Sequence, residues 1–364
     1  MPKKIFVAAT MQNDGKTTVC LGLISCLRKY FKRIGFIKPI GQRYLIEQGY
    51  KVDEDSVLID DIFGIKINIK DMSPIAIEKG FTERYIEKPK KESLVRQIEK
   101  SFEKVSKNKD LVIIEGTGHA GVGSVFDLSN ATVAKLLDAK VIIVSSGGIG
   151  RPIDEIVLNK ALFEKENVEI LGVIINKVLP EKFKKVNRFV RKGLLRNGLR
   201  VLGVIPYKQY LTLPTMRQIK EELRIQVLSG EKNLDRIVNK VIVGAMEPHD
   251  ALNYIGEKSL LITPGDREDL LLTALSCSAI GLKRKCEVSG IILSGGIIPH
   301  NSIMRLAENS GIPILLSQKD TYSVASEVHD LTVKIKPEDR KKTKVVMDLV
   351  NKFVDVKKII KLLD

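Results

Sequence analysis

The sequence contains no tryptophan, and aromatic residues make up only 5% of its 364 residues. Because 44% of the residues are hydrophobic, we expect aliphatic cores built mainly from isoleucine, valine and leucine. No apolar run approaches the roughly 18 residues that a membrane-spanning helix needs. The first ten residues also lack the cleavage pattern of a signal peptide. These absences predict a cytoplasmic protein with no membrane partner.

Cysteine is scarce as well. The four cysteines are Cys20, Cys26, Cys277 and Cys286, and no two of them have CxxC spacing. This pattern argues against a zinc site or a disulfide framework. We expect reduced, mostly buried thiols.

Acidic residues are outnumbered, with 44 Asp and Glu against 60 Lys and Arg, for a net charge of +16. Such an excess is one mark of nucleic-acid binding. Here the cations are scattered among glutamates, which is typical of solvated helix faces and also of heat-adapted proteins. The densest basic stretch, residues 181–200, is predicted to be an amphipathic helix with two phenylalanines for stacking. Polyanion binding is an alternative there, but nucleic acid is not the partner we expect.

Short β-branched runs alternate with helical patterns along the chain, which predicts an α/β fold with parallel sheets. In the first part we expect strands at 4–10, 33–40, 111–116, 140–146, 169–176 and 200–206, with helices at 17–31, 92–106, 151–166 and 181–196. After Pro214 a second α/β unit is predicted, with strands at 240–246, 259–265, 288–296, 312–317 and 331–336 and helices at 268–282, 300–310 and 321–328. The pattern favours a domain over 1–213, a smaller one over 214–345 and a terminal helix over 346–364.

The segment "ATMQNDGKTT", residues 9–18, lies between the first predicted strand and the first predicted helix. A glycine-rich loop in this position places backbone N–H groups and the helix dipole toward a phosphate. We predict that Asp14, Gly15, Lys16, Thr17 and Thr18 bind nucleotide, with the Lys16 ammonium at the β- and γ-phosphates and the Thr17 hydroxyl on Mg²⁺. A chance Gly-Lys-Thr at a helix start is the alternative.

The spacing of this loop resembles the dethiobiotin synthetase branch of P-loop proteins, in which the loop opens with Gly-Thr and closes with Gly-Lys-Thr. In this chain Ala9 replaces the opening glycine. Alanine fits there only if its φ angle is negative. The resemblance implies a P-loop NTPase-type parallel sheet with flanking helices, and a nucleotide with Mg²⁺ as cofactor.

Further residues follow that family in order. Lys38, in the step "IKPI", is implied to face the γ-phosphate or an anionic substrate. Asp55, with Asp53 as second choice, is implied to hold Mg²⁺ at the start of a helix. Glu115 ends a buried apolar strand before the glycine-rich turn "GTGHAG", which is the family's second metal-binding position and suits Mg²⁺. Lys16, Lys38 and Glu115 are thus the candidate catalytic residues, and Thr17, Asp55 and Glu115 the candidate metal ligands.

Two later segments could contact the nucleotide base. Asn176 and Lys177 follow one predicted strand, and in related P-loop proteins an asparagine here reads the adenine edge. Pro206 closes the next strand, where the family packs backbone against the same ring. An amide can both donate and accept hydrogen bonds, so adenine recognition is reasonable chemistry, although it leaves ATP against GTP open.

The second unit resembles the DRTGG domain, in the segments "VGAMEPHDAL", "ITPGDRED" and "GIILSGGIIP". Asp266 and Arg267 could cap a helix and bind a small anion, and Gly295 and Gly296 form a second turn near enough to share that ligand. A helix cap with a surface ion pair, and a tight turn, are the structural alternatives.

Together, the two domains resemble the N-terminal half of long phosphotransacetylases, as a free-standing chain without the catalytic domain. This resemblance favours a regulatory or sensory protein that binds ATP or ADP with Mg²⁺ and an unidentified small anion, and that forms a homodimer. An ATP-dependent ligase that activates a carboxylate or carbamate is the alternative. Acetyl transfer by this chain alone is not expected.

Overall fold

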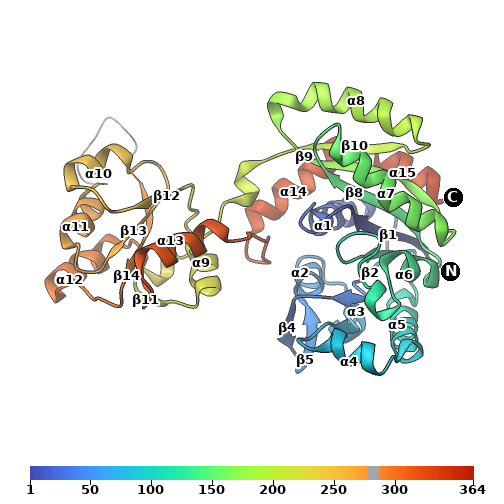
Figure 1. Ribbon diagram of the computed structural model, residues 1–364, viewed down its shortest axis with the longest axis horizontal. Helices are drawn as coiled ribbons and strands as arrows, with labels where there is room; N and C mark the ends of the chain where they lie inside the picture. The colour runs from blue at the N-terminus through green and yellow to red at the C-terminus, as the bar shows by residue number, and fades with distance from the viewer. Residues whose placement is uncertain (278–286) are drawn as a thin grey trace. The chain divides into compact units, whose positions relative to one another are not determined.

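A computed structural model describes residues 1–277 and 287–364 of the chain. The chain divides into two compact units, one of Met1–Lys208 with Ile335–Asp364 and one of Gln209–Lys334 (Figure 1). Each unit has its own sheet and core. The division differs from the domain limits expected at 213 and 345, because residues 335–345 are part of the first unit.

The first unit is built on a six-stranded, fully parallel sheet in the order β10-β9-β8-β1-β7-β2. Its strands are β1 (Lys3–Ala9), β2 (Ile34–Ile37), β7 (Leu111–Glu115), β8 (Lys140–Ser146), β9 (Ile170–Val178) and β10 (Val201–Pro206). Their side chains are buried on both faces, as expected for strands covered by helices on each side. The predicted parallel sheet is confirmed.

Helices cover both faces of this sheet. One face packs against α5 (Lys91–Ser106), α6 (Asn130–Leu136), α7 (Arg151–Lys165) and α8 (Phe183–Arg196). The other packs against α1 (Lys16–Leu27), α14 (Arg340–Phe353) and α15 (Val356–Leu363). Beside β2 lie α2 (Glu54–Phe63), α3 (Ile69–Met72), α4 (Phe81–Glu87) and two small sheets, β3 (Ile40–Gly41) with β6 (Ile75–Ala76) and β4 (Tyr44–Glu47) with β5 (Tyr50–Asp53).

The C-terminal segment forms two helices, which differs from the single helix expected over 346–364. The break lies at Val354, which forms an antiparallel bridge with Gly203 of β10, and the Asp355 N–H donates to the Leu202 carbonyl. Asp355 then caps α15 by accepting from the Lys358 N–H at 3.0 Å. The helix is therefore interrupted at these residues, and backbone groups at the edge of β10 gain hydrogen-bond partners.

The second unit has a mixed five-stranded sheet in the order β11-β15-β14-β13-β12. The strands are β11 (Gln226–Ser229), β12 (Lys240–Val243), β13 (Ser259–Pro264), β14 (Val288–Ser294) and β15 (Ile314–Leu316), and the helices are α9 (Met216–Leu223), α10 (Pro248–Tyr254), α11 (Glu268–Ser276), α12 (Asn301–Ser310) and α13 (Thr321–Asp330). The strand predicted at 331–336 is wrong. The edge of β15 is instead taken by antiparallel β11, for which no strand was predicted.

The helix predicted over 268–282 is confirmed over Glu268–Ser276, and residues 278–282 lie outside the described part of the chain. Cys20 and Cys26 are free thiols, as expected. Cys277 is disulfide-bonded, which corrects the expectation for that residue, and Cys286 lies outside the described residues. Within the described residues, every helix is too short or too polar to span a bilayer.

Candidate nucleotide-binding site

The loop between β1 and α1 depends on glycine at position 15. Gly15 is the N-cap of α1 with φ of 96°, and Asn13 also has a positive φ of 68°. A Cβ atom at Gly15 would lie 2.3 Å from Nδ2 of Asn176. Both the backbone conformation and the close approach of Asn176 therefore exclude other residues from this position.

The structure explains why alanine can occupy position 9, where the dethiobiotin synthetase loop opens with glycine. Ala9 is the last residue of β1, is paired with Val144 of β8 and has no positive φ angle. Its side chain is fully buried. Because the backbone here is still an extended strand, the loop does not need the conformational freedom of glycine at this residue.

Asp14 is buried, and its carboxylate holds the loop together. One oxygen accepts hydrogen bonds from the Thr10 hydroxyl at 2.8 Å and the Met11 N–H at 2.7 Å. The other accepts from the Ser146 hydroxyl at 2.5 Å. The Asp14 side chain is thus occupied by these three contacts, and the nucleotide-binding role of Asp14 stays a prediction.

Lys16 begins α1, and its side chain is nearly buried, with 8% of the residue exposed. Its ammonium forms no hydrogen bond or ion pair with any residue that the structure describes. Burial lowers the pKa of Lys16, although Glu115, Asp14 and Asp55 act in the opposite direction. The first turn of α1 contains no acidic side chain. A buried cation beside the N–H groups of a helix N-terminus is a site for an anion.

Glu115 ends β7, where β7 pairs with β1, and contacts the start of α1. Its Oε1 accepts a hydrogen bond from the Thr17 hydroxyl at 2.8 Å, and its Oε2 is buried without a hydrogen-bond partner. Burial, together with the nearby Asp55 carboxylate, raises the pKa of Glu115 to about 7. Thr17 and Glu115, two of the predicted metal ligands, are thus in contact.

Lys38 follows β2, and its ammonium lies among three acidic side chains. It is 2.8 Å from Asp53 Oδ1, in closer contact with Asp55 Oδ2, and 3.8 Å from Glu115 Oε1. Burial by itself would lower the pKa of Lys38, but Asp55, Glu115 and Asp53 outweigh it and hold this pKa well above its usual value. We call these four residues the lysine–carboxylate cluster.

The small elements after β2 position the two aspartates. Asp53 ends β5 and caps α2, accepting from the Asp55 N–H at 3.0 Å, and its own N–H donates to the Ser73 hydroxyl. Asp55 is therefore in the first turn of α2, directed at Lys38. The hairpin of β4 and β5 that delivers this turn was not predicted from the sequence.

The donor set suits a hard cation such as Mg²⁺, because Thr17, Asp55 and Glu115 offer only oxygen atoms. The buried, unpartnered Glu115 Oε2 and Asp53 Oδ2 are further available acceptors. Within the described residues, however, no three acidic, histidine or cysteine side chains are already arranged to hold a metal ion. These side chains offer the type of ligand atom that such an ion needs. The Lys38 ammonium, however, already contacts Asp55 and is 3.8 Å from Glu115.

The glycine-rich turn after β7 is held by two asparagines that sequence reasoning missed. Asn130 accepts from the Thr117 N–H at 3.0 Å and donates to the Thr117 and His119 carbonyls, each at 2.6 Å. Asn159 accepts from the Ala120 N–H at 2.7 Å. Asn159 lies inside the predicted helix over 151–166, and Asn130 begins α6, for which no helix was predicted. Only their burial in the folded chain reveals the role. His119 itself is exposed.

The predicted base contacts lie beside the loop. Asn176 Nδ2 donates to the Asp14 carbonyl at 2.9 Å, and the Lys177 ammonium donates to the Asn13 carbonyl at 2.6 Å. Burial lowers the pKa of Lys177. Pro206 ends β10 next to β9, which carries both residues. Asn176 and Lys177 thus hold the loop backbone in place, and one amide N–H of Asn176 is left over for a ligand.

In the second unit the two predicted turns meet, but their polar residues are occupied. Gly265 lies so close to Ile297 that a Cβ atom would be 1.8 Å from its carbonyl oxygen, and Gly295 and Gly296 have φ of 77° and 68°. Arg267 forms a bidentate pair with Asp269, at 2.9 Å on both oxygens. Asp266 does not cap α11; the N-cap is Arg267, without a side-chain bond.

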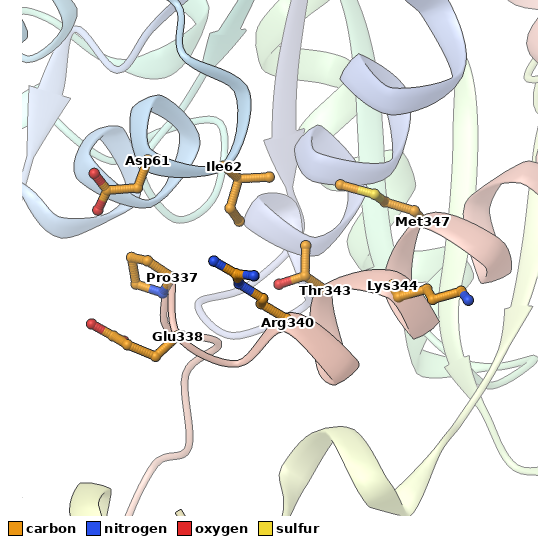
Figure 2. A pocket seen from close by; sticks show the side chains of 8 residues that line it. All are labelled: Asp61, Ile62, Pro337, Glu338, Arg340, Thr343, Lys344 and Met347. Atoms are coloured by element: carbon orange, nitrogen blue, oxygen red, sulfur yellow. The ribbon is translucent and has the colours of Figure 1, made fainter.

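A separate cavity of about 540 Å³ lies in the first unit between α2 and the start of α14 (Figure 2). Asp61 and Ile62 line it from α2, and the opposite side is formed by Pro337, Glu338, Arg340, Thr343, Lys344 and Met347. None of these residues is among those predicted for the nucleotide site. Figure 2 shows side chains of both charges around it.

The chain is similar to several solved structures at low identity. A plasmid partition protein from Borrelia burgdorferi B31 bound to AMPPNP is 16% identical over 58% of this chain and 87% of its own, with a TM-score of 0.38. MinD from Pyrococcus horikoshii OT3 with Mg-ADP is 14% identical over 58% and 84%, with a TM-score of 0.36. The CBS and DRTGG domains of a Clostridium perfringens pyrophosphatase are 22% identical over 38% and 60%, with a TM-score of 0.28.

Curated relatives match nearly the whole chain. The phosphate acetyltransferase of Nitratidesulfovibrio vulgaris is 29% identical over 98% of this chain and 51% of its own length. That of Pseudomonas putida is 29% identical over 96% and 50%. The chain spans about half the length of these relatives. Residues 3–215 match the AAA domain family and residues 218–331 match the DRTGG domain. The chain therefore belongs to the AAA domain family, with a P-loop domain followed by a DRTGG domain.

Proposed function

We propose that the chain binds ATP or ADP with Mg²⁺ at residues 9–18 and acts as a regulatory or sensory nucleotide-binding protein. The observation that carries this proposal is the nearly buried Lys16 side chain at the N-terminus of α1, whose ammonium forms no ion pair within the described residues. A largely buried cation without a partner is costly, and an anion at the loop would relieve that cost. Phosphate is the anion that such loops bind.

Mg²⁺ would be held by Thr17, Asp55 and Glu115, and it would supply charge neutralisation at the phosphates. The adenine edge would meet the remaining N–H of Asn176, with Lys177 and Pro206 beside it. Asn176 gives little basis for choosing ATP over GTP. Its amide nitrogen already donates to the Asp14 carbonyl, and its amide oxygen already accepts from the Lys177 N–H.

A regulatory role is favoured over catalysis by the second unit. The proposal includes a small anionic ligand at Asp266, Arg267, Gly295 and Gly296, and this ligand would have to displace Asp269 from Arg267. It also includes a homodimer, which sedimentation of the full chain would detect. Acetyl transfer by this chain alone is not part of the proposed function. The cations and carboxylates of the first-unit site suit the binding of phosphate and a metal ion.

The second candidate is an ATP-dependent ligase that phosphorylates a carboxylate or carbamate. It is favoured by the presence of two buried lysines, Lys16 and Lys38, around Glu115, since phosphoryl transfer depends on positioning and charge neutralisation. Release of inorganic phosphate that requires a carboxylate substrate would support this candidate over the regulatory one.

Calorimetry of the full chain with ATP, ADP, GTP and AMP, with and without Mg²⁺, tests the proposal. Lys16→Ala is expected to weaken binding by roughly 100-fold, or about 2.7 kcal/mol. Lys29→Ala is the matched control, because Lys29 is an exposed lysine just beyond the end of the same helix. If the wild type binds none of the nucleotides, or if Lys16→Ala binds them as tightly, the proposal is wrong.

A further inference from the structure

The lysine–carboxylate cluster concentrates charge in a buried space. Lys38, Asp53, Asp55 and Glu115 are each less than 10% exposed. One ammonium faces three acids, and Glu115 Oε2 and Asp53 Oδ2 still have no hydrogen-bond partner. A lysine is thus the resident cation of a group of oxygens whose chemistry also suits a divalent cation.

A divalent cation and the Lys38 ammonium compete for the same oxygens. Lys38 contacts Asp55 and approaches Glu115, which are two of the three residues that would hold Mg²⁺. Like charges a few ångströms apart repel strongly in a poorly solvated interior. Within the described part of the chain, no three acids are arranged to hold a metal ion. The Lys38 ammonium is within 4 Å of all three acids of the cluster.

The ammonium can move away only toward another anion, since isolating a buried charge is costly. Lys38 is linked to the phosphate loop through Glu115, whose Oε1 is 3.8 Å from the Lys38 ammonium and accepts from the hydroxyl of Thr17, the residue after Lys16. Lys16 in turn starts the helix that follows the phosphate loop. A phosphate bound at the loop would therefore lie within electrostatic reach of both lysines and offer Lys38 a replacement partner.

We propose that Lys38 makes the divalent-cation site conditional: the carboxylates accept a divalent cation only when an anion at the loop takes over the Lys38 ammonium. This inference rests on the proposed function, because the anion is a phosphate at residues 9–18. Binding of the two ligands is then coupled, and by linkage the divalent cation strengthens phosphate binding as much as phosphate strengthens cation binding. Lys38 is the residue that sets the coupling.

The test is titration of the full chain with Mn²⁺ alone, followed by the electron paramagnetic resonance signal of the free ion. Wild type is expected to bind Mn²⁺ weakly, and Lys38→Met to bind it at least about tenfold more tightly, because the competing cation is gone. Lys29→Met is the control. It also removes a positive charge, but at an exposed position just beyond the end of α1, so its Mn²⁺ affinity should stay close to that of wild type.

Removing Lys38 leaves three buried acids without their counter-ion, which destabilises the folded state. The double variant Lys38→Met with Asp53→Asn restores the charge balance of the cluster and keeps Asp55 and Glu115. It should also bind Mn²⁺ alone at least about tenfold more tightly than Asp53→Asn, which retains the lysine. Circular dichroism identifies the folded variants that enter the comparison.

Addition of the non-hydrolysable analogue AMPPNP completes the test, and the Mn²⁺ that the analogue chelates by itself is measured in a protein-free titration and subtracted. Wild type should then bind Mn²⁺ at least about tenfold more tightly, while the Lys38 variants should gain much less. Equal affinity of wild type and the folded Lys38 variants for Mn²⁺ alone would overturn the inference. If AMPPNP binds yet leaves Mn²⁺ affinity unchanged, the conditional site is wrong while nucleotide binding stands. If no nucleotide binds, the proposed function itself fails.

Discussion

Replacing Glu115 with glutamine should change the pH dependence of stability in a defined direction. Glu115 is 1% exposed, and burial raises its pKa from 4.5 to about 7. Its Oε1 accepts from Thr17, and its Oε2 has no partner. Glutamine has the same shape and keeps the oxygen that Thr17 contacts, but it carries no charge at any pH. The substitution therefore isolates the cost of ionising this side chain.

The magnitude follows from proton linkage. Between pH 4.5 and 7 the folded protein retains the Glu115 proton while the unfolded chain has lost it. The free energy of unfolding of wild type thus falls as pH rises through this window. A difference of about 2.5 pKa units corresponds to about 3 kcal/mol at 1.36 kcal/mol per unit. Above pH 7 the full penalty is present, and below pH 4.5 it is absent.

Urea unfolding followed by far-ultraviolet circular dichroism at pH values from 4.5 to 8.5 measures the effect. The stability of Glu115→Gln relative to wild type should rise by about 3 kcal/mol across this range. A cost of burying the glutamine amide is the same at every pH, so it does not change how the stability difference between the variant and wild type depends on pH. Glu99→Gln, at an exposed position of α5, is the control and should show almost no such trend. A relative stability of Glu115→Gln that does not change with pH would refute the reasoning.

Three further predictions concern exchanges between glycine and alanine in the first unit. Ala9→Gly should leave nucleotide affinity in calorimetry within about twofold of wild type, because Ala9 is in extended backbone, and it should lower stability by roughly 0.5–1 kcal/mol. Gly15→Ala should abolish nucleotide binding, because the φ of 96° and the 2.3 Å approach of Asn176 both exclude a side chain at this position. A gain in affinity for Ala9→Gly would contradict this. Gly22→Ala should destabilise the unit by roughly 1–3 kcal/mol in thermal unfolding, since its Cβ would lie 2.2 Å from Val350 of α14. Val350→Ala should partly reverse that loss, and additive effects of the two substitutions would disprove the contact.

The strands and helices that carry the site could be predicted because each is a local pattern. The six central strands are mostly apolar, and the phosphate loop has its required glycine and lysine at fixed spacing. The second unit shows where local patterns fail. Residues 331–336 have a strand-like sequence but no strand, whereas β11, for which no strand was predicted, pairs along β15. Pairing depends on which edge is available, and that is a property of the whole sheet.

By itself, the sequence determined which residues end each parallel strand, because β-branched runs, loop spacing and the acid at position 115 are all read along the chain. Only the tertiary structure decided what those residues contact. Asp14 and Asn176, predicted as nucleotide ligands, hold the loop, and Asn130 and Asn159 hold the turn after β7. Lys38 lies among Asp53, Asp55 and Glu115, which are up to 77 residues away in the chain but share one buried space. Ion pairing and burial act through distance in space, which spacing in sequence does not contain.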